Sequence, residues 1–167
     1  MEKMSGVSIL VENTCCFIGH REINETEQLK LRLQTAIEKL IVEEKVDTFL
    51  FGSKSRFDKL CLEIVTKIKE KYPQIKRVYV RAEYPYISED YKNYLLKKYD
   101  YTYYPEKIIK SGRAIYVKRN CEIINNSRFC IVYYDERYAH VIRKSGTKIA
   151  LDYAVAQEKI ILLFNAR

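Results

Sequence analysis

The sequence predicts a doubly wound α/β protein: a mainly parallel, five-stranded sheet with helices on both faces. Three observations support this fold class. Short apolar runs alternate with longer amphipathic segments of helical period along the chain. The runs are apolar at consecutive positions, as in parallel strands that helices cover on both sides. Glycine turns follow several of the runs, and right-handed crossovers would bring these turns to one edge of the sheet.

The first half of the chain supplies three strands and two helices. In order, we expect a strand over residues 14–18, a helix over about 25–44, a strand over 48–51, a helix that ends near 71 and a strand over 76–80. Leu29, Leu33 and Ile37 fall on one stripe of the first helix, and Asn24 is its expected N-cap. Residues 1–13 are interpreted as a polar lead-in.

The second half repeats the pattern after an irregular stretch. We expect a helix over about 114–125, a strand over 129–133, a loop over 135–145, a helix over 147–157 and a strand over 159–164. Residues 82–112 break the rhythm, since they hold two prolines and most of the tyrosines around one short helix at about 88–98. We interpret them as a Tyr-rich insertion or lid on a single domain that spans residues 1–167.

Composition limits the classes of protein. No apolar run approaches the roughly 20 residues of a membrane-spanning helix, and the amino terminus lacks the apolar region of a signal peptide. The sequence therefore predicts a cytoplasmic protein with no membrane partner. The five cysteines show no metal-ligand spacing, so no metal site is expected and free thiols are favoured over disulfides.

The charge balance is basic, with a net charge of +8 and a pI near 9.1. This is typical of a partner that is a nucleic acid or another polyanion, but a solvated surface with surplus lysine explains the charge equally simply. The chain also has 15 tyrosines. Tyrosines stack on bases, but they also fill interfaces and the edges of cores.

The first glycine turn, at the end of the first strand, reads Gly19-His20-Arg21. In a functional interpretation, the glycine admits a ligand and Arg21 binds a carboxylate or phosphate. In the structural alternative, the histidine and arginine cap the sheet or pair with Glu22.

The second turn, Gly52-Ser53-Lys54, leads into the second helix, where small hydroxyl residues and cations could cradle phosphate. It lacks the Walker A pattern. Asp58 would cap its helix, bind a ribose, or do both.

The third turn is Ser145-Gly146-Thr147, where Thr147 would cap the last helix and neighbouring N–H groups would meet an anion. A simple helix cap is the alternative. The pair Arg119-Asn120, on the helix before the fourth strand, carries little meaning alone.

Together these stretches resemble a known family. The sequence Cys16-Phe17-Ile18-Gly19-His20-Arg21 resembles the opening C-F-T-G-H-R signature of the YpsA-like proteins of the SLOG superfamily, a domain of unknown function. The later stretches over residues 116–120, 133–135 and 145–154 follow the family's order, and the likeness covers roughly residues 14–164.

The resemblance implies a Rossmann-like sheet, a nucleotide-derived ligand and a homodimer or larger homo-oligomer. The superfamily also includes the DNA-processing protein DprA, cytokinin-activating phosphoribohydrolases and sensor domains of phage-defence systems. Two departures stand out. Arg56 replaces the second glycine of the family's Gly-x-Ala-x-Gly-x-Asp turn, and Ala150 stands where the phosphoribohydrolases carry a catalytic glutamate.

We therefore expect a non-catalytic module that binds or senses a nucleotide-derived ligand, and no further cofactor is assigned. The expected ligand-binding residues are Gly19, His20, Arg21, Gly52, Ser53, Lys54, Asp58, Arg119, Asn120, Ser145, Gly146 and Thr147. One alternative is a nucleoside-monophosphate glycosidase, in which Glu22, Asp58 or Asp135 supplies the missing carboxylate. Another is a DprA-like protein that binds single-stranded nucleic acid.

Overall fold

The computed structural model describes residues 2–4, 7–138 and 145–165. Its centre is one parallel sheet with the strand order β6-β5-β4-β3-β7-β8. The strands are β3 (Thr14–Gly19), β4 (Thr48–Phe51), β5 (Lys76–Val80), β6 (Tyr101–Tyr103), β7 (Phe129–Tyr133) and β8 (Ile160–Phe164). The predicted Rossmann-like α/β class is confirmed, but the sheet has six strands and not the predicted five.

The helices alternate with these strands along the chain. They are α1 (Glu27–Glu43), α2 (Arg56–Lys71), α3 (Glu89–Leu95), α4 (Ile115–Asn125) and α5 (Gly146–Ala156). Short 3-10 turns lie at Val11–Asn13, Glu106–Ile108, Gly112–Ala114 and Glu136–Tyr138. Within the described part of the chain, no helix combines the length and the apolar character that crossing a membrane requires.

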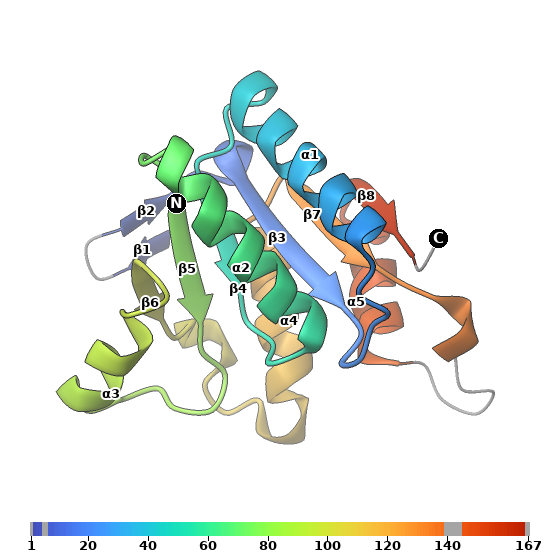
Figure 1. Ribbon diagram of the computed structural model, residues 1–167. Coiled ribbons are helices and arrows are strands. Elements are labelled where there is room, and N and C mark those ends of the chain that lie inside the picture. The colour runs from blue at the N-terminus through green and yellow to red at the C-terminus, as the bar shows by residue number, and fades with distance from the viewer. Residues whose placement is uncertain (1, 5–6, 139–144, 166–167) are drawn as a thin grey trace.

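The order of the strands creates one switch point. From β3 the chain adds β4, β5 and β6 on one side, and it then returns to add β7 and β8 on the other side. The carboxyl ends of all six strands therefore meet at one edge, at the bottom of the view in Figure 1. In such folds a ligand binds beyond this edge, where the strand order reverses.

Two apolar layers hold the sheet between its helices. On the face covered by α1 and α2, the core includes Phe17 and Phe49. On the opposite face, covered by α4 and α5, the core includes Cys16 and Cys130, which pair in register on β3 and β7. Because successive strand residues point to opposite faces, one apolar run fills both layers.

The helix starts follow short polar caps, and two of them correct the sequence analysis. Thr26, rather than Asn24, caps α1 through a hydrogen bond from the Leu29 N–H. Ser145, rather than Thr147, caps α5 through a bond from the Lys148 N–H. Both hydroxyls satisfy a donor that the first helical turn leaves unpaired.

The amino-terminal segment is not a simple polar lead-in, contrary to the prediction. Strands β1 (Glu2–Met4) and β2 (Val7–Ile9) pair in antiparallel fashion beside the main sheet. Ile9 is buried in the layer beneath α4 and α5. The hydroxyl of Thr14 donates to the carbonyl of Leu10 at 2.7 Å, which links this segment to the start of β3.

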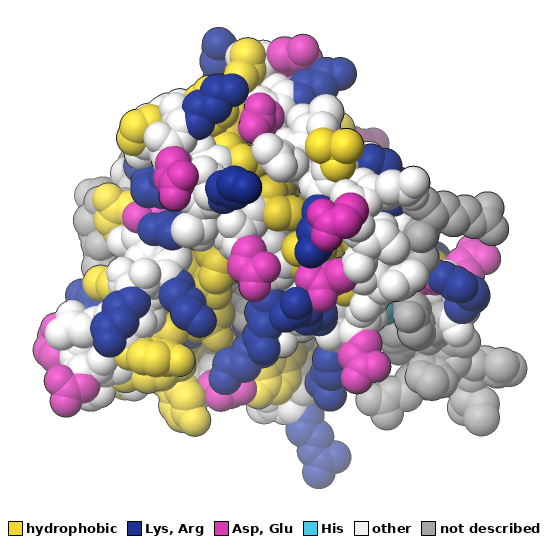
Figure 2. Space-filling model, viewed as in Figure 1, with side chains coloured by type: hydrophobic (Ala, Val, Ile, Leu, Met, Phe, Trp, Pro, Cys, Tyr) yellow, Lys and Arg dark blue, Asp and Glu magenta, His cyan; other side chains and the backbone are white. Residues whose placement is uncertain are grey.

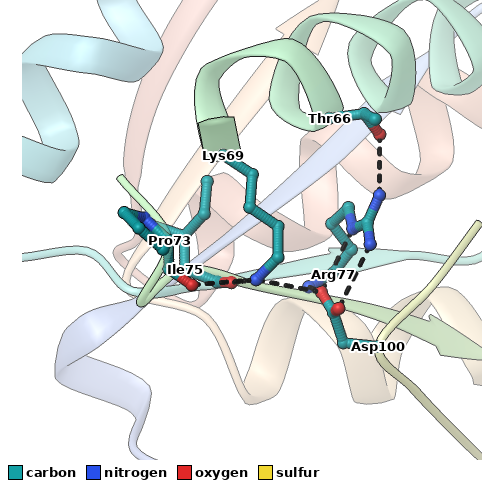
Figure 3. A network of polar contacts seen from close by, with 6 residues as sticks. All are labelled: Thr66, Lys69, Pro73, Ile75, Arg77 and Asp100. Atoms are coloured by element: carbon teal, nitrogen blue, oxygen red, sulfur yellow. Dashed lines mark hydrogen bonds and ion pairs between the residues drawn. The ribbon is translucent and has the colours of Figure 1, made fainter. Parts of the chain in front are cut away.

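The sixth strand belongs to the stretch predicted to be an insertion. β6 pairs with β5, with Val78 opposite Tyr101. Figure 3 shows how it is fastened: the Arg77 guanidinium makes two hydrogen bonds of 3.1 Å to the Asp100 carboxylate. Asp100 also accepts from the backbone N–H of Arg77 at 2.8 Å, and Lys69 lies 3.7 Å from the same carboxylate.

We expect Asp100→Asn to lower the free energy of unfolding by ~1–3 kcal/mol, because it removes the charge from several charge-assisted hydrogen bonds in a half-buried site. Urea unfolding gives the stability, and hydrogen exchange at residues 101–103 should accelerate first. Glu38→Gln is a matched control, because the only ion pair of the half-buried Glu38 within the described residues is one of 4.0 Å with the exposed Lys71. Equal effects of the two variants would contradict the role of the Arg77–Asp100 pair.

Candidate functional site

A cavity of about 840 Å³ lies at the carboxyl edge of the sheet, beyond the ends of β3, β4 and β5 and beside α4 and the start of α5. Every residue predicted from the sequence to bind a ligand lines it, with the exception of Asp58. These lining residues are Gly19, His20, Arg21, Gly52, Ser53, Lys54, Arg119, Asn120, Ser145, Gly146 and Thr147. The three glycine turns therefore converge on one space, as the parallel topology requires.

Gly19 is required by the protein's own packing. A Cβ atom at this position would lie 2.3–2.5 Å from the Phe57 side chain, which is fully buried at the start of α2. Close approach of α2 to the end of β3 therefore explains this glycine without any ligand. A hydrogen bond of 2.8 Å from the Arg56 N–H to the Arg21 carbonyl also joins the start of α2 to the loop after β3.

His20 ties two strands together as a neutral imidazole. Its Nε2 accepts a hydrogen bond of 3.0 Å from the Asp135 N–H, which joins the ends of β3 and β7. An accepting Nε2 places the ring proton on Nδ1. Burial lowers the pKa of His20, so the neutral form is favoured. The cavity therefore gains little positive charge from this residue.

Asp58 lies beneath the cavity and holds the loop after β4. Its Oδ2 accepts from the backbone N–H groups of Gly52 and Ser53 at 3.3 and 3.1 Å. Its Oδ1 is buried without a hydrogen-bond partner in the described residues, and burial raises the pKa of this carboxyl to about 7. Since Asp58 is only 3% exposed, the predicted ribose contact would require this loop to move.

The start of α2 is already occupied by groups of the chain itself. Ser55 caps the helix, and its own N–H donates to the Ser53 hydroxyl at 3.1 Å. The Arg56 guanidinium forms an ion pair of 2.6 Å with Glu25. These contacts, together with the bond to Arg21, use most donors that could otherwise meet a phosphate at this helix.

Arg119 is the most informative residue of the cavity wall. It is 5% exposed, yet no carboxylate lies within ion-pair distance of it in the described residues. Its Nη1 donates to the Gly52 carbonyl at 2.5 Å, its Nε donates to Asn120 at 3.1 Å, and the guanidinium lies over the Tyr116 ring. Burial lowers the pKa of Arg119. Gly52 makes room for it, since a Cβ there would approach the Arg119 side chain to 2.9 Å.

The start of α5 offers open donors beside Arg119. Ser145 caps the Lys148 N–H, whereas the N–H groups of Gly146 and Thr147 have no acceptor among the residues that the structure describes. A Cβ on Gly146 would meet nothing within 4 Å. A pocket of about 40 Å³ leads down to these residues and to Asn120, which is enough for a small polar group.

Sequence reasoning missed a second set of lining residues. Arg81 follows β5, and it holds a loop by donating to the carbonyls of Tyr84 and Pro85 at 3.1 and 3.3 Å. Tyr79 and Tyr91 also line the cavity. The predicted site rested on glycines that come directly after strands, and no glycine follows β5 in this way. The signal that could have indicated this part of the cavity was Arg81, a charged residue directly after an apolar strand.

Acidic residues divide into two groups. Glu22 and Glu83 line the cavity. Asp135 does not, and hydrogen bonds from Arg137 hold the pKa of its carboxyl down at about 2. No cluster of metal-ligating side chains occurs in the described residues. Of the predicted loop over 135–145, positions 139–144 lie outside the described residues.

Two glycine substitutions should have opposite effects on stability. We expect Gly19→Ala to cost ~1–3 kcal/mol, because its new methyl group overlaps Phe57. Gly146→Ala should be neutral or stabilise by up to ~1 kcal/mol, because its methyl group meets open space in a helix. Urea unfolding of both variants checks this, and a stable Gly19→Ala protein would show that α2 does not pack as described.

Asp58 should give an identifiable pH dependence. Its pKa of about 7 in the folded protein compares with ~3.9 in an unfolded chain. The folded protein thus keeps a proton that the unfolded chain loses, and the resulting stability fades as the pH rises through 7. Relative to Asp58→Asn, wild type should lose up to ~1.4 kcal/mol per pH unit between about pH 4 and 7. Urea unfolding at several pH values measures the difference in free energy of unfolding between wild type and Asp58→Asn. Asp90→Asn is the control, because Asp90 is exposed. A difference between wild type and Asp58→Asn that stays constant from about pH 4 to 7 would contradict the prediction.

A scan against models of protein families and a search of curated proteins found no match to this chain. The resemblance carried by residues 16–21 therefore remains an expectation from the sequence.

Proposed function

We propose that the protein binds or senses a nucleotide-derived ligand, as a YpsA-like member of the SLOG superfamily, and that it does not catalyse a reaction on that ligand. The single observation that carries this proposal is Arg119. A guanidinium almost wholly removed from water, without a carboxylate partner in the described residues, lines an open cavity.

Burial disfavours the charge of Arg119, and the carboxyl groups of Asp58 and Glu83 offset it only from beyond ion-pair distance, so an anion in the cavity would stabilise it further. The open N–H groups of Gly146 and Thr147 would bind the same anion at the positive end of the α5 dipole. A phosphoryl group suits this arrangement, because it offers several oxygens to a forked guanidinium and to backbone donors together.

Other charges of the cavity support an anionic ligand. Arg21, Lys54 and Arg81 join Arg119 in the lining, against the carboxylates of Glu22 and Glu83. The surplus of cations should raise the local concentration of a phosphorylated compound. These cations lie along the carboxyl edge of the sheet, the edge beyond which ligands bind in this fold.

Binding is favoured over glycoside cleavage by the placement of acidic groups. Ala150, at the position of the phosphoribohydrolase glutamate, is buried in the layer between α5 and the sheet. Of the three carboxylates predicted as substitutes, only Glu22 lines the cavity. Such cleavage needs an acid or base positioned at the glycosidic bond, and the other carboxylate of the cavity, Glu83, is already hydrogen-bonded to Tyr116.

Nucleic-acid binding by a DprA-like route has less support. Figure 2 shows basic side chains near the edge where the strands end, but acidic side chains lie among them across the same face. A strand of nucleic acid favours a continuous basic track. A small phosphorylated ligand requires only the local cluster.

Self-association is part of the proposal. β8 is an edge strand of the sheet, and Ile160 and Leu163 on it are substantially exposed, as is Val155 on α5. An apolar edge of this kind is usually covered by another chain. Native mass spectrometry of protein taken from cells would report both the subunit number and the mass of a co-purifying ligand.

We expect Arg119→Met to abolish the thermal stabilisation that wild type shows with GMP, AMP or ribose 5-phosphate. Its stability without ligand should change by no more than ~1–2 kcal/mol, because it loses two hydrogen bonds but also removes a buried charge that makes no ion pair within the described residues. Arg128→Met is the matched control, since Arg128 is exposed and lies before β7, at the opposite edge.

Equal stabilisation of wild type and Arg119→Met by any of these compounds would contradict the proposal. So would release of free base from GMP or AMP during long incubation, which would favour the glycosidase. A gel shift with single-stranded DNA at low salt that fades with added salt would favour nucleic-acid binding instead.

A further inference from the structure

A second hollow, of about 450 Å³, opens beside the main cavity. We call it the aromatic annex: Tyr84, Tyr86, Ile87 and Tyr91 form its wall, and Lys54 and Glu83 form its rim. Lys54, Glu83, Tyr84 and Tyr91 also line the main cavity, so the two spaces are continuous. A ligand held at Arg119 by one end can therefore extend into the annex.

The annex is anchored to the sheet by Arg81. Besides the carbonyls of Tyr84 and Pro85, its guanidinium donates to the Thr102 hydroxyl at 3.1 Å. Thr102 lies on β6 and donates in turn to the Tyr79 carbonyl at 2.9 Å. The annex wall is thus fixed to β5 and β6 through one guanidinium.

The aromatic wall presents ring surface to solvent. Tyr84 is 55% exposed and Tyr86 is 88% exposed. Tyr84 and Tyr91 pack edge to face with centroids 6.4 Å apart. Exposed tyrosines beside a cationic cavity are suited to a flat ring, because every nucleobase has a face that stacks on an aromatic side chain.

We propose, on the basis of the proposed function, that the aromatic annex holds the base of the nucleotide and that Glu83 and Lys54 select guanine. The Glu83 Oε1 accepts from the Tyr116 hydroxyl at 2.6 Å, which holds the carboxylate in place. Its Oε2 makes no hydrogen bond within the described residues.

Guanine complements this pair of side chains. Its Watson–Crick edge presents two neighbouring N–H donors for a carboxylate, next to the O6 acceptor for an ammonium group. Adenine presents an acceptor nitrogen at the middle of that edge, which a carboxylate repels. Hypoxanthine keeps the central N–H and O6 but lacks the amino group, so it should rank between the two.

Calorimetry on the full chain with GMP, IMP, AMP and ribose 5-phosphate tests the proposal. GMP should bind ~10–100-fold more tightly than AMP, because the Glu83 carboxylate accepts hydrogen bonds from guanine but faces an acceptor nitrogen in adenine. IMP should fall between them. Glu83→Gln should reduce the difference between GMP and AMP, whereas ribose 5-phosphate should bind at least as tightly as to wild type, because one carboxylate that repels phosphate is removed.

Tyr91→Ala should weaken GMP binding ~5–100-fold through lost stacking and weaken ribose 5-phosphate binding by much less, because that compound has no base to stack. Tyr94→Ala is the matched control, because Tyr94 stacks on Tyr91 but lines neither space. Circular dichroism checks that each variant folds. The order of affinity of wild type for GMP, IMP and AMP tests the proposal without any variant.

The outcomes separate the two proposals. If all four compounds bind equally and Arg119→Met abolishes binding, the phosphate site stands and the annex proposal is wrong. AMP binding at least as tightly as GMP overturns the selection of guanine. If none of the four binds, the proposed function fails and the annex proposal fails with it.

Discussion

The site depends on the burial of one guanidinium at the carboxyl edge of the sheet. Arg119 enters from α4 and bonds to the Gly52 carbonyl, which only a residue without a side chain leaves open. Asp58 holds the same loop from below, because its carboxylate accepts hydrogen bonds from the backbone N–H groups of Gly52 and Ser53. The loop after β4 is therefore fixed between a cation above and a carboxyl beneath, and its own donors face inward. The open donors of the cavity are instead those at the start of α5.

The three glycine turns share a place in the fold but not a physical cause. Gly19 allows Phe57 to approach β3, and Gly52 allows Arg119 to pass. A Cβ on Gly146 would meet no atom of the described residues within 4 Å, so among the three turns this one leaves open space beside N–H groups that have no acceptor in the described part of the chain. A glycine after a strand therefore indicates the edge where a ligand would bind. Where a Cβ on the glycine would clash with other side chains, the glycine is required for packing. Where a Cβ would meet no atom, the glycine borders an open space.

The sequence predicted the parallel sheet and the convergence of its turns, because both follow from short strands with mainly apolar residues at consecutive positions and from strong helical periodicity. It missed short elements held by tertiary contacts. β6 has three residues with no apolar run and is fastened by the Arg77–Asp100 pair, and β1 and β2 are equally short. For the site, it found the residues after glycines and missed Arg81 and the aromatic annex, because their roles depend on hydrogen bonds across the fold.

The attachment of β6 at the outer edge has a consequence for how such a protein could diversify. The aromatic annex rests on β5 and β6, whereas Arg119 and the start of α5 lie around the central strands. Under the proposed function, changes at the outer strands would alter which ligand is preferred, while the proposed phosphate site around Arg119 would persist. Under the same proposal, related chains would bind different ligands on one conserved central sheet.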